Sequence, residues 1–267
     1  MLTIFISLFG GFAATYVTMN VLDWGNTGSI WTGIGVFFVL QLAIGLFIRK
    51  KINGVTGEIQ QLMEKTQNKL NRKMAQMQSR PMSSPKAAQQ LLEKEQNQAL
   101  QEALKITEKA KPYYLWNILL KRQINTMRMM LFYQLKEFKK VDALLDKCFL
   151  VDGRSVAIKA ARMFKNQNPK CEKYLAKKCR RFKGDDAVLL YALYSWILVK
   201  QEKYDEASAI LAQAKNRLDN PVLNANRENL VNGKVKHFSN ANLGEAWYSL
   251  YLEEPKIKQQ RIVQRGF

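Results

Sequence analysis

Two long apolar runs near the start of the sequence constrain its fold most. They cover Leu2–Leu22 and Ile30–Ile48, and neither contains Asp, Glu, Lys, Arg or His. A helix of about 20 residues rises roughly 30 Å, which matches the hydrocarbon thickness of a bilayer. We therefore predict a transmembrane helical hairpin over residues 1–50, with spans at about 2–22 and 30–48.

Charges beside the runs predict the orientation of this hairpin. Arg49, Lys50 and Lys51 follow the second run directly, whereas the link between the runs holds Asp23 and no Lys or Arg. Cations favour the cytoplasmic side, so we expect an integral membrane protein with both termini in the cytoplasm. The bacterial plasma membrane is the preferred location, with an organelle membrane as the alternative. The predicted membrane-interface anchors are Trp24, Arg49, Lys50 and Lys51.

A cleaved signal peptide is the alternative interpretation of the first run. The stretch Gly10–Ala14 resembles a small-residue cleavage site. However, Met1–Ile4 has no basic residue, and the run exceeds the 7–15 residues of a usual signal-peptide core. We therefore expect the first span to be retained.

Small residues predict that the two spans pack against each other. A hairpin brings Gln41 level with Gly10 and Gly11, where the backbones can approach closely and the amide needs a hydrogen-bond partner. Further close contacts are expected at Gly33, Gly35 and Gly45.

Composition predicts that the remainder is all-α. The 267 residues include only 6 Pro and 14 Gly, 47% are hydrophobic, and long stretches are rich in Lys, Gln, Leu, Ala and Glu. The three cysteines, Cys148, Cys171 and Cys179, are odd in number and widely spaced. A disulfide framework is therefore not expected, which agrees with a reducing cytoplasm.

Residues 51–84 are predicted to form a basic juxtamembrane helix that ends in a Pro/Ser break. Gly54 and Gly57 suggest a flexible joint near its start, and Ser84 and Pro85 are the expected N-cap and first residue of the next helix. The helix carries a seam at alternating spacings of four and three, which indicates a weak coiled coil or a solvated stalk. Its members are Ile59, Met63, Thr66, Leu70, Lys73 and Met77.

An internal pattern favours helical repeats over residues 85–255. Tyr204, Ala207, Leu211 and Ala214 recur at offsets of 3, 4 and 3, after a helix expected at Val188–Lys200. This pattern resembles the second helix of a tetratricopeptide (TPR) repeat. The same offsets occur at Phe138, Val141, Leu145 and Cys148. Other helices are expected at Ser155–Asn166, Lys170–Phe182 and Pro221–Lys236, with a further repeat opening at Glu245–Leu250.

The resemblance implies a TPR-like α-solenoid of antiparallel helix pairs, followed by a basic tail at residues 256–267. An unrelated helical array is the alternative. Solenoids expose a concave surface made by the first helices of successive repeats. Here that predicted partner groove would contain Asn125, Arg128, Tyr191, Tyr194 and Trp196.

Net charge gives a second candidate surface. The chain carries 42 Lys and Arg against 22 Asp and Glu, a formal net charge of +20. The excess of basic over acidic residues is largest around the helix expected at Lys170–Phe182. The candidate residues for binding an anionic surface are Lys170, Lys173, Lys177, Lys178, Arg180 and Arg181. Such a face either keeps the protein soluble or attracts anionic lipid, an acidic protein segment or RNA.

The sequence contains no recognisable catalytic motif. The single histidine, His237, lies beside a turn aromatic, and Cys171 and Cys179 are too far apart for adjacent metal ligands. We predict no enzyme activity, catalytic residue, cofactor or metal. The sequence favours a membrane-anchored adaptor for protein–protein interaction, and the alternative is a tether that holds RNA, ribosomes or anionic lipid through its basic helices.

Overall fold

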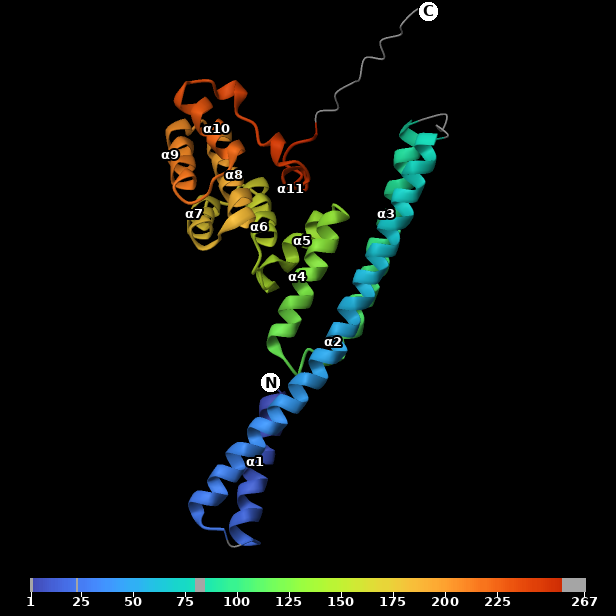
Figure 1. Ribbon diagram of the computed structural model, residues 1–267, viewed down its shortest axis with the longest axis vertical. Helices are drawn as coiled ribbons and strands as arrows, with labels where there is room; N and C mark the ends of the chain where they lie inside the picture. Colours follow the sequence, from blue (N-terminus) through green and yellow to red (C-terminus); the bar gives the residue numbers. More distant parts are fainter. Residues whose placement is uncertain (1, 23, 80–84, 256–267) are drawn as a thin grey trace, which may run out of the picture. The chain divides into compact units, whose positions relative to one another are not determined.

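The computed structural model describes residues 2–22, 24–79 and 85–255, and every regular element in these ranges is a helix (Figure 1). The expected Pro/Ser break, its Ser84 cap and the basic tail lie outside them. The chain divides into two compact units, Met1–Phe149 and Leu150–Phe267. This division differs from the boundary expected at residues 84 and 85, because the helix that begins at Pro85 folds back onto the first unit.

The first unit begins with two helices that are long and apolar enough to cross a membrane. They are α1 (Leu2–Asn20) and α2 (Asn26–Ser79). The joint expected at Gly54 and Gly57 is absent: α2 is one uninterrupted helix of 54 residues. Since neither glycine has a neighbour within 4 Å of an added Cβ, close packing does not explain them, and the helix tolerates both.

Small residues bring α1 and the first part of α2 together. Ser7 Oγ donates to Gln41 Oε1 at 3.0 Å, so the Gln41 amide has the hydrogen-bond partner that it needs, one turn before the expected level of Gly10 and Gly11. A Cβ on Gly11 would lie 2.9 Å from the Gly33 carbonyl oxygen, and one on Gly33 would lie 2.8 Å from the Gly11 oxygen. The expectation for Gly35 and Gly45 is wrong, because nothing lies within 4 Å of either position.

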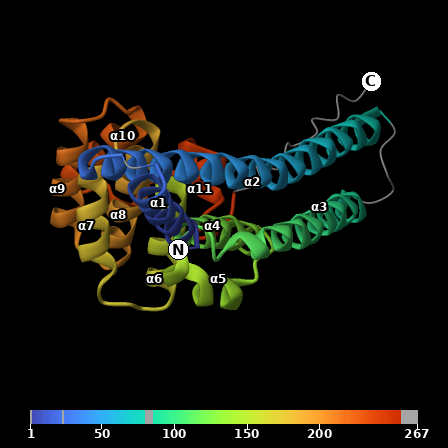
Figure 2. The same cartoon turned by 90° about the horizontal axis from the view of Figure 1, so that it is seen from below.

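The third helix, α3 (Pro85–Thr107), runs back alongside α2 (Figures 1 and 2). The predicted seam of α2 faces this helix, which explains why its heptads need no second chain. Ile59 packs with Leu100 and Ala103, and Lys73 donates to Glu95, which also pairs with Lys69 at 3.5 Å.

A 3₁₀ helix, η1 (Glu108–Tyr113), continues α3 and leads into α4 (Ile118–Gln134). A second core cluster joins this region to α2 through Ile48, Ala110 and Ile124. The unit ends with the short helices α5 (Phe138–Leu144) and η2 (Leu145–Lys147).

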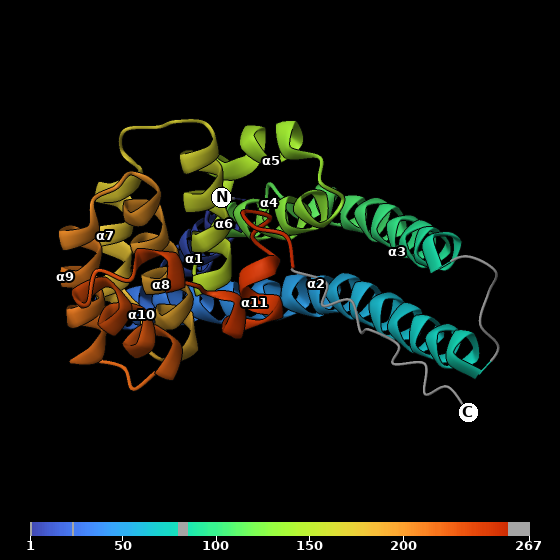
Figure 3. The ribbon, with the colours of Figure 1, turned by 90° about the horizontal axis from the view of Figure 1, so that it is seen from above.

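The second unit is built around α8 (Gly184–Lys200), which packs on the helices before and after it (Figure 3). Every α8 side chain from Ala187 to Leu198 is buried, because its sequence is apolar on all sides. The other elements are α6 (Gly153–Lys165), α7 (Cys171–Arg181), α9 (Tyr204–Lys215), α10 (Pro221–Val231), η3 (Val235–His237), η4 (Ala241–Leu243) and α11 (Glu245–Tyr248).

These helices start close to the predicted positions, but the last two predictions are wrong in extent. The helix expected to reach Lys236 ends at Val231, where the left-handed φ of +66° at Gly233 turns the chain. The helix expected at Glu245–Leu250 is only four residues long. Ala207, Leu211 and Ala214 are buried, as any amphipathic helix pair requires, so their burial does not establish a repeat family.

Candidate functional site: the basic face of α7

The helix α7 separates its apolar and charged residues cleanly. Cys171, Leu175 and Cys179 are buried at a four-residue spacing, which confirms that both cysteines are core residues. We call the six candidate cations, five on α7 and Lys170 at its N-cap, the basic face. Lys170, Lys173, Lys177, Arg180 and Arg181 are exposed, and Lys178 is half-buried.

Neighbouring acids do not neutralise the basic face. Its six cations form no ion pair with any described residue, and the one acid of α7, Glu172, accepts instead from Lys203 Nζ at 2.8 Å. Lys178 Nζ lies 5.4 Å from the centroid of the Tyr174 ring. Burial lowers the pKa of Lys178, and the charges of Arg181, Lys177 and Lys159 lower it further. Such mutual repulsion is what a bound anion would relieve.

Arg217 holds the end of α7 in place, and no pattern in the sequence indicates this role. Its guanidinium donates to the carbonyl oxygens of Cys179 at 3.1 Å and Arg180 at 3.0 Å, and to Tyr191 Oη at 3.2 Å. A cation at a helix C-terminus satisfies carbonyls that have no partner within the helix. The basic face is therefore fixed to α8 and to the end of α9 by one side chain.

Three of the five residues predicted for the partner groove are part of the core. Tyr191, Tyr194 and Trp196 are all less than a tenth exposed, because α8 is surrounded by other helices. The Trp196 indole N–H donates to Glu253 Oε1 at 2.8 Å, and its ring meets Phe164 edge to face. The groove prediction is wrong for these residues.

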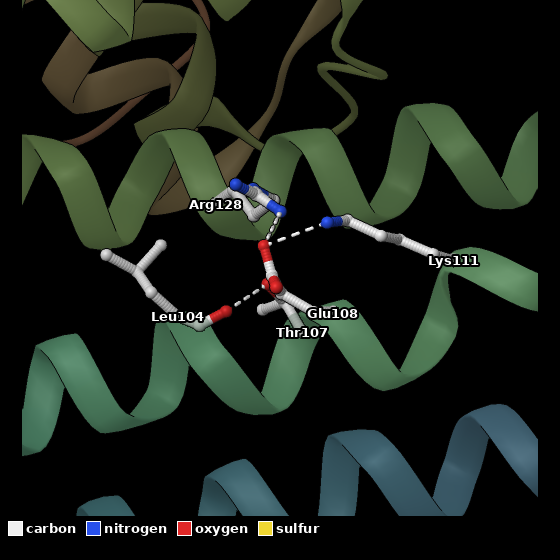
Figure 4. Close-up of polar contacts among 5 residues, drawn as sticks. All are labelled: Leu104, Thr107, Glu108, Lys111 and Arg128. Carbon is white, nitrogen blue, oxygen red and sulfur yellow. Dashed lines mark hydrogen bonds and ion pairs between the residues drawn. The ribbon is translucent and has the colours of Figure 1, made fainter.

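The other two predicted groove residues belong to α4 of the first unit. Asn125 is buried and donates to the Lys147 carbonyl oxygen at 3.3 Å. Arg128 lies 3.6 Å from Glu108 Oε1, which also accepts from Lys111 at 3.0 Å (Figure 4). These contacts lower the pKa of Glu108, chiefly through the hydrogen bond from Lys111. Arg128 therefore fastens η1 to α4.

The four predicted membrane-interface anchors are all exposed. Trp24 lies in the link between α1 and α2, and Arg49, Lys50 and Lys51 lie on α2. Lys51 Nζ is 5.8 Å from the centroid of the Phe47 ring. The aromatic and the basic anchors therefore stand at opposite ends of the apolar part of α2.

The described residues show no assembled metal site. No three His, Cys, Asp or Glu side chains within them lie close enough to share an ion. His237 is exposed, and its carbonyl oxygen accepts from Asn229 at 3.2 Å. Burial raises the pKa of Cys171 to about 11 and that of Cys179 to about 12, so neither thiol is activated as a nucleophile.

Comparison with known proteins gives no family for this chain. No protein-family model, curated protein or solved structure matches it. The resemblance to TPR repeats accordingly stays a prediction from the sequence.

Proposed function

We propose that this chain is a membrane-anchored, non-catalytic scaffold whose helical second unit presents a cytoplasmic surface to a protein partner. The observation that carries the proposal is the apolar outer surface of α1 and of the first part of α2. Many large side chains on this surface are more than half exposed, among them Phe5, Phe9, Phe12, Trp31, Leu42 and Leu46. Contiguous apolar surface of this kind is unfavourable in water and expected in lipid.

Helix α2 connects the anchor to the scaffold without a joint. After Lys51 it continues to Ser79, which is about 40 Å of further helix at 1.5 Å per residue. With the cations Arg49, Lys50 and Lys51 on the cytoplasmic side, this rigid continuation and α3 stand in the cytoplasm. In this arrangement the first unit is both anchor and spacer, and the TPR-like second unit offers the binding surface.

The scaffold proposal is tested by extracting the full-length chain from native membranes in copolymer nanodiscs. We expect one protein to co-purify in near-stoichiometric amount. The matched control is Leu175→Asp, which places a charge in the core of the second unit and leaves the anchor intact. Loss of the partner from this variant supports the proposal, whereas a native preparation with no protein above background contradicts it.

A tether for RNA or for an anionic lipid surface is the second candidate, and the unneutralised basic face favours it. Binding of RNA should weaken steeply with salt, because each contact releases counterions. Reversing Lys173, Lys177, Arg180 and Arg181 to Glu should then abolish binding by the full chain in zwitterionic nanodiscs.

A charge-matched variant separates a specific face from net charge alone. It reverses four exposed lysines elsewhere: Lys65, Lys105, Lys139 and Lys215. If the two variants lose RNA binding equally, or if neither loses it, the basic face is not an RNA site. Selective binding of vesicles containing anionic lipid assigns the face to a membrane surface instead.

A further inference from the structure

The link between η1 and α4 lies beside the first turn of α1. The backbone N–H of Leu2 donates to the Leu115 carbonyl oxygen at 3.1 Å. Thr3 Oγ1 donates to the Trp116 carbonyl oxygen, also at 3.1 Å. The first N–H groups of a helix have no partner within it, so the link satisfies one such group, that of Leu2, which would otherwise be costly to place near lipid.

The same link also packs on α2 at one defined level. Tyr113, Tyr114 and Trp116 pack against the core cluster that contains Ile48. Arg49, Lys50 and Lys51 follow Ile48 directly, so the link sits where the apolar part of α2 meets its first cations. Contacts with two helices fix this position, although the link is far from both of them in sequence.

The link and the first turn of α4 expose two leucine side chains, one on each side of the exposed polar Asn117. Leu115 is 70% exposed and Leu119 is 46% exposed, and three half-buried aromatic side chains lie between or just before them. Exposed cations flank the segment on both sides, at Lys111, Lys121 and Arg122. Aromatic residues with leucine and flanking cations are typical of segments that lie in the headgroup region of a bilayer.

We propose that residues 113–119 form a third membrane contact, in which Leu115 and Leu119 enter the headgroup boundary of the leaflet on the Arg49 side. The ligand is phospholipid. The inference rests on the proposed function, because it takes α1 and the first part of α2 to cross that bilayer. It goes further in assigning a membrane-binding role to a segment that no hydropathy pattern marks as a span.

Such a contact has a consequence for α4. The chain enters α4 directly from the link, with Asn117 as the N-cap that accepts from the Leu119 N–H at 2.9 Å. Seating the link in the bilayer therefore restrains the start of α4 at the membrane surface. The first unit is held by two spans and one surface contact, which restricts its tilt more than two spans alone.

The test places a nitroxide label at Leu115→Cys in full-length protein, reconstituted in phospholipid nanodiscs. The background carries Cys148→Ser, and the two remaining native thiols, Cys171 and Cys179, are buried. Collision of the label with oxygen, which dissolves in lipid, is compared with collision with a water-soluble nickel chelate. A label at Leu119→Cys provides a second variant should the first fail to fold.

Two control labels define the collision ratios expected in lipid and in water. Phe9→Cys lies on the exposed face of α1 and reports lipid, and Leu91→Cys is an exposed leucine near the start of α3 that reports water. We expect the ratio of oxygen to nickel collisions at Leu115 to be several-fold higher than at Leu91 and to approach that at Phe9.

Each of the other outcomes contradicts either the third membrane contact or the proposed function. If the collision ratio at Leu115 equals that at Leu91 while Phe9 reports lipid, the third membrane contact is contradicted and the two proposed spans are not. A Leu115 label shielded from both reagents shows that protein covers the link, which also removes the inference. A Phe9 label in water contradicts the proposed function itself.

Discussion

Two helices of this chain, α1 in the first unit and α7 in the second, bury side chains at the same four-residue spacing. Their chemistry is reversed. In α1 the residues buried at this spacing are Thr3, Ser7 and Gly11, and Thr18 is buried further along, whereas Phe5, Phe9 and Phe12 are exposed. In α7 the buried face consists of Cys171, Leu175 and Cys179, with Lys173, Lys177 and Arg180 exposed.

The contrast shows that packing through a single face is compatible with two different surroundings, lipid and water. Each helix needs only one face to meet its neighbours, and the composition of the opposite face reports what surrounds it. Large apolar side chains outside and small polar ones inside suit lipid, where close backbone approach replaces the hydrophobic effect. Charged side chains outside and apolar ones inside suit water.

The largest effect is expected from charging the outer face of the first unit. Phe12→Arg with Phe38→Arg places two cations on exposed positions of α1 and α2, each at a cost of about 3 kcal/mol in a bilayer. We expect the chain to be lost from sedimented membranes. Phe12→Leu with Phe38→Leu is the control and should sediment normally. Equal sedimentation of both variants would show that this face does not contact lipid.

The corresponding change in the second unit removes an apolar contact from α7. Leu175→Ala should lower the free energy of unfolding by about 2–5 kcal/mol, because the side chain is fully buried. Lys177→Ala, on the exposed face, should change it by less than about 0.5 kcal/mol. Urea unfolding followed by tryptophan fluorescence measures both. Similar losses for the two variants would mean that α7 is not seated on the core as described.

Close backbone approach in the first unit predicts a smaller effect. Gly33→Leu should cost about 1–3 kcal/mol and separate α1 from α2, because an added Cβ meets the Gly11 backbone. Gly35→Leu meets nothing within 4 Å and serves as the control. Oxidative cross-linking of Ser7→Cys with Gln41→Cys reports the separation. The packing is contradicted if both glycine variants cross-link alike.

Much of this difference between α1 and α7 could be predicted from the sequence, because the hydropathy of an exposed face indicates the solvent that it suits. The sequence placed the two apolar helices and the face that buries Cys171 and Cys179, and it showed that Gln41 needs a partner without identifying Ser7. It could not show that the α2 seam is covered by α3 of the same chain, because periodicity indicates a face but does not identify its partner.

The candidate site was predicted less well than the fold. The cations of α7 were found because charged residues fall on the face opposite a clear apolar stripe. Tyr191, Tyr194 and Trp196 were misplaced because α8 is apolar on all sides, so the sequence offers no face to choose. Arg217 was missed because its acceptors are backbone carbonyls, which leave no pattern in the side chains.

The smallest effect concerns the thiols. The raised pKa values of Cys171, about 11, and Cys179, about 12, mean that folding favours the protonated thiols. Their contribution to stability is present below the ordinary cysteine pKa of about 9 and is lost as the pH rises towards 12. Maleimide at pH 8 should therefore modify only the half-buried Cys148 until urea unfolds the second unit. Mass spectrometry of the labelled chain counts the adducts, and early modification at three sites would be inconsistent with the burial.

The central claim is that α1 and the first part of α2 cross a bilayer and leave the remaining helices on one side. It is tested most directly by a membrane-impermeant maleimide applied to sealed cells, with single exposed cysteines at Asn26→Cys or Asn68→Cys in a Cys148→Ser background. The account predicts labelling of Asn26→Cys in sealed cells and of Asn68→Cys only after permeabilisation. Equal labelling of the two positions in sealed cells would contradict it.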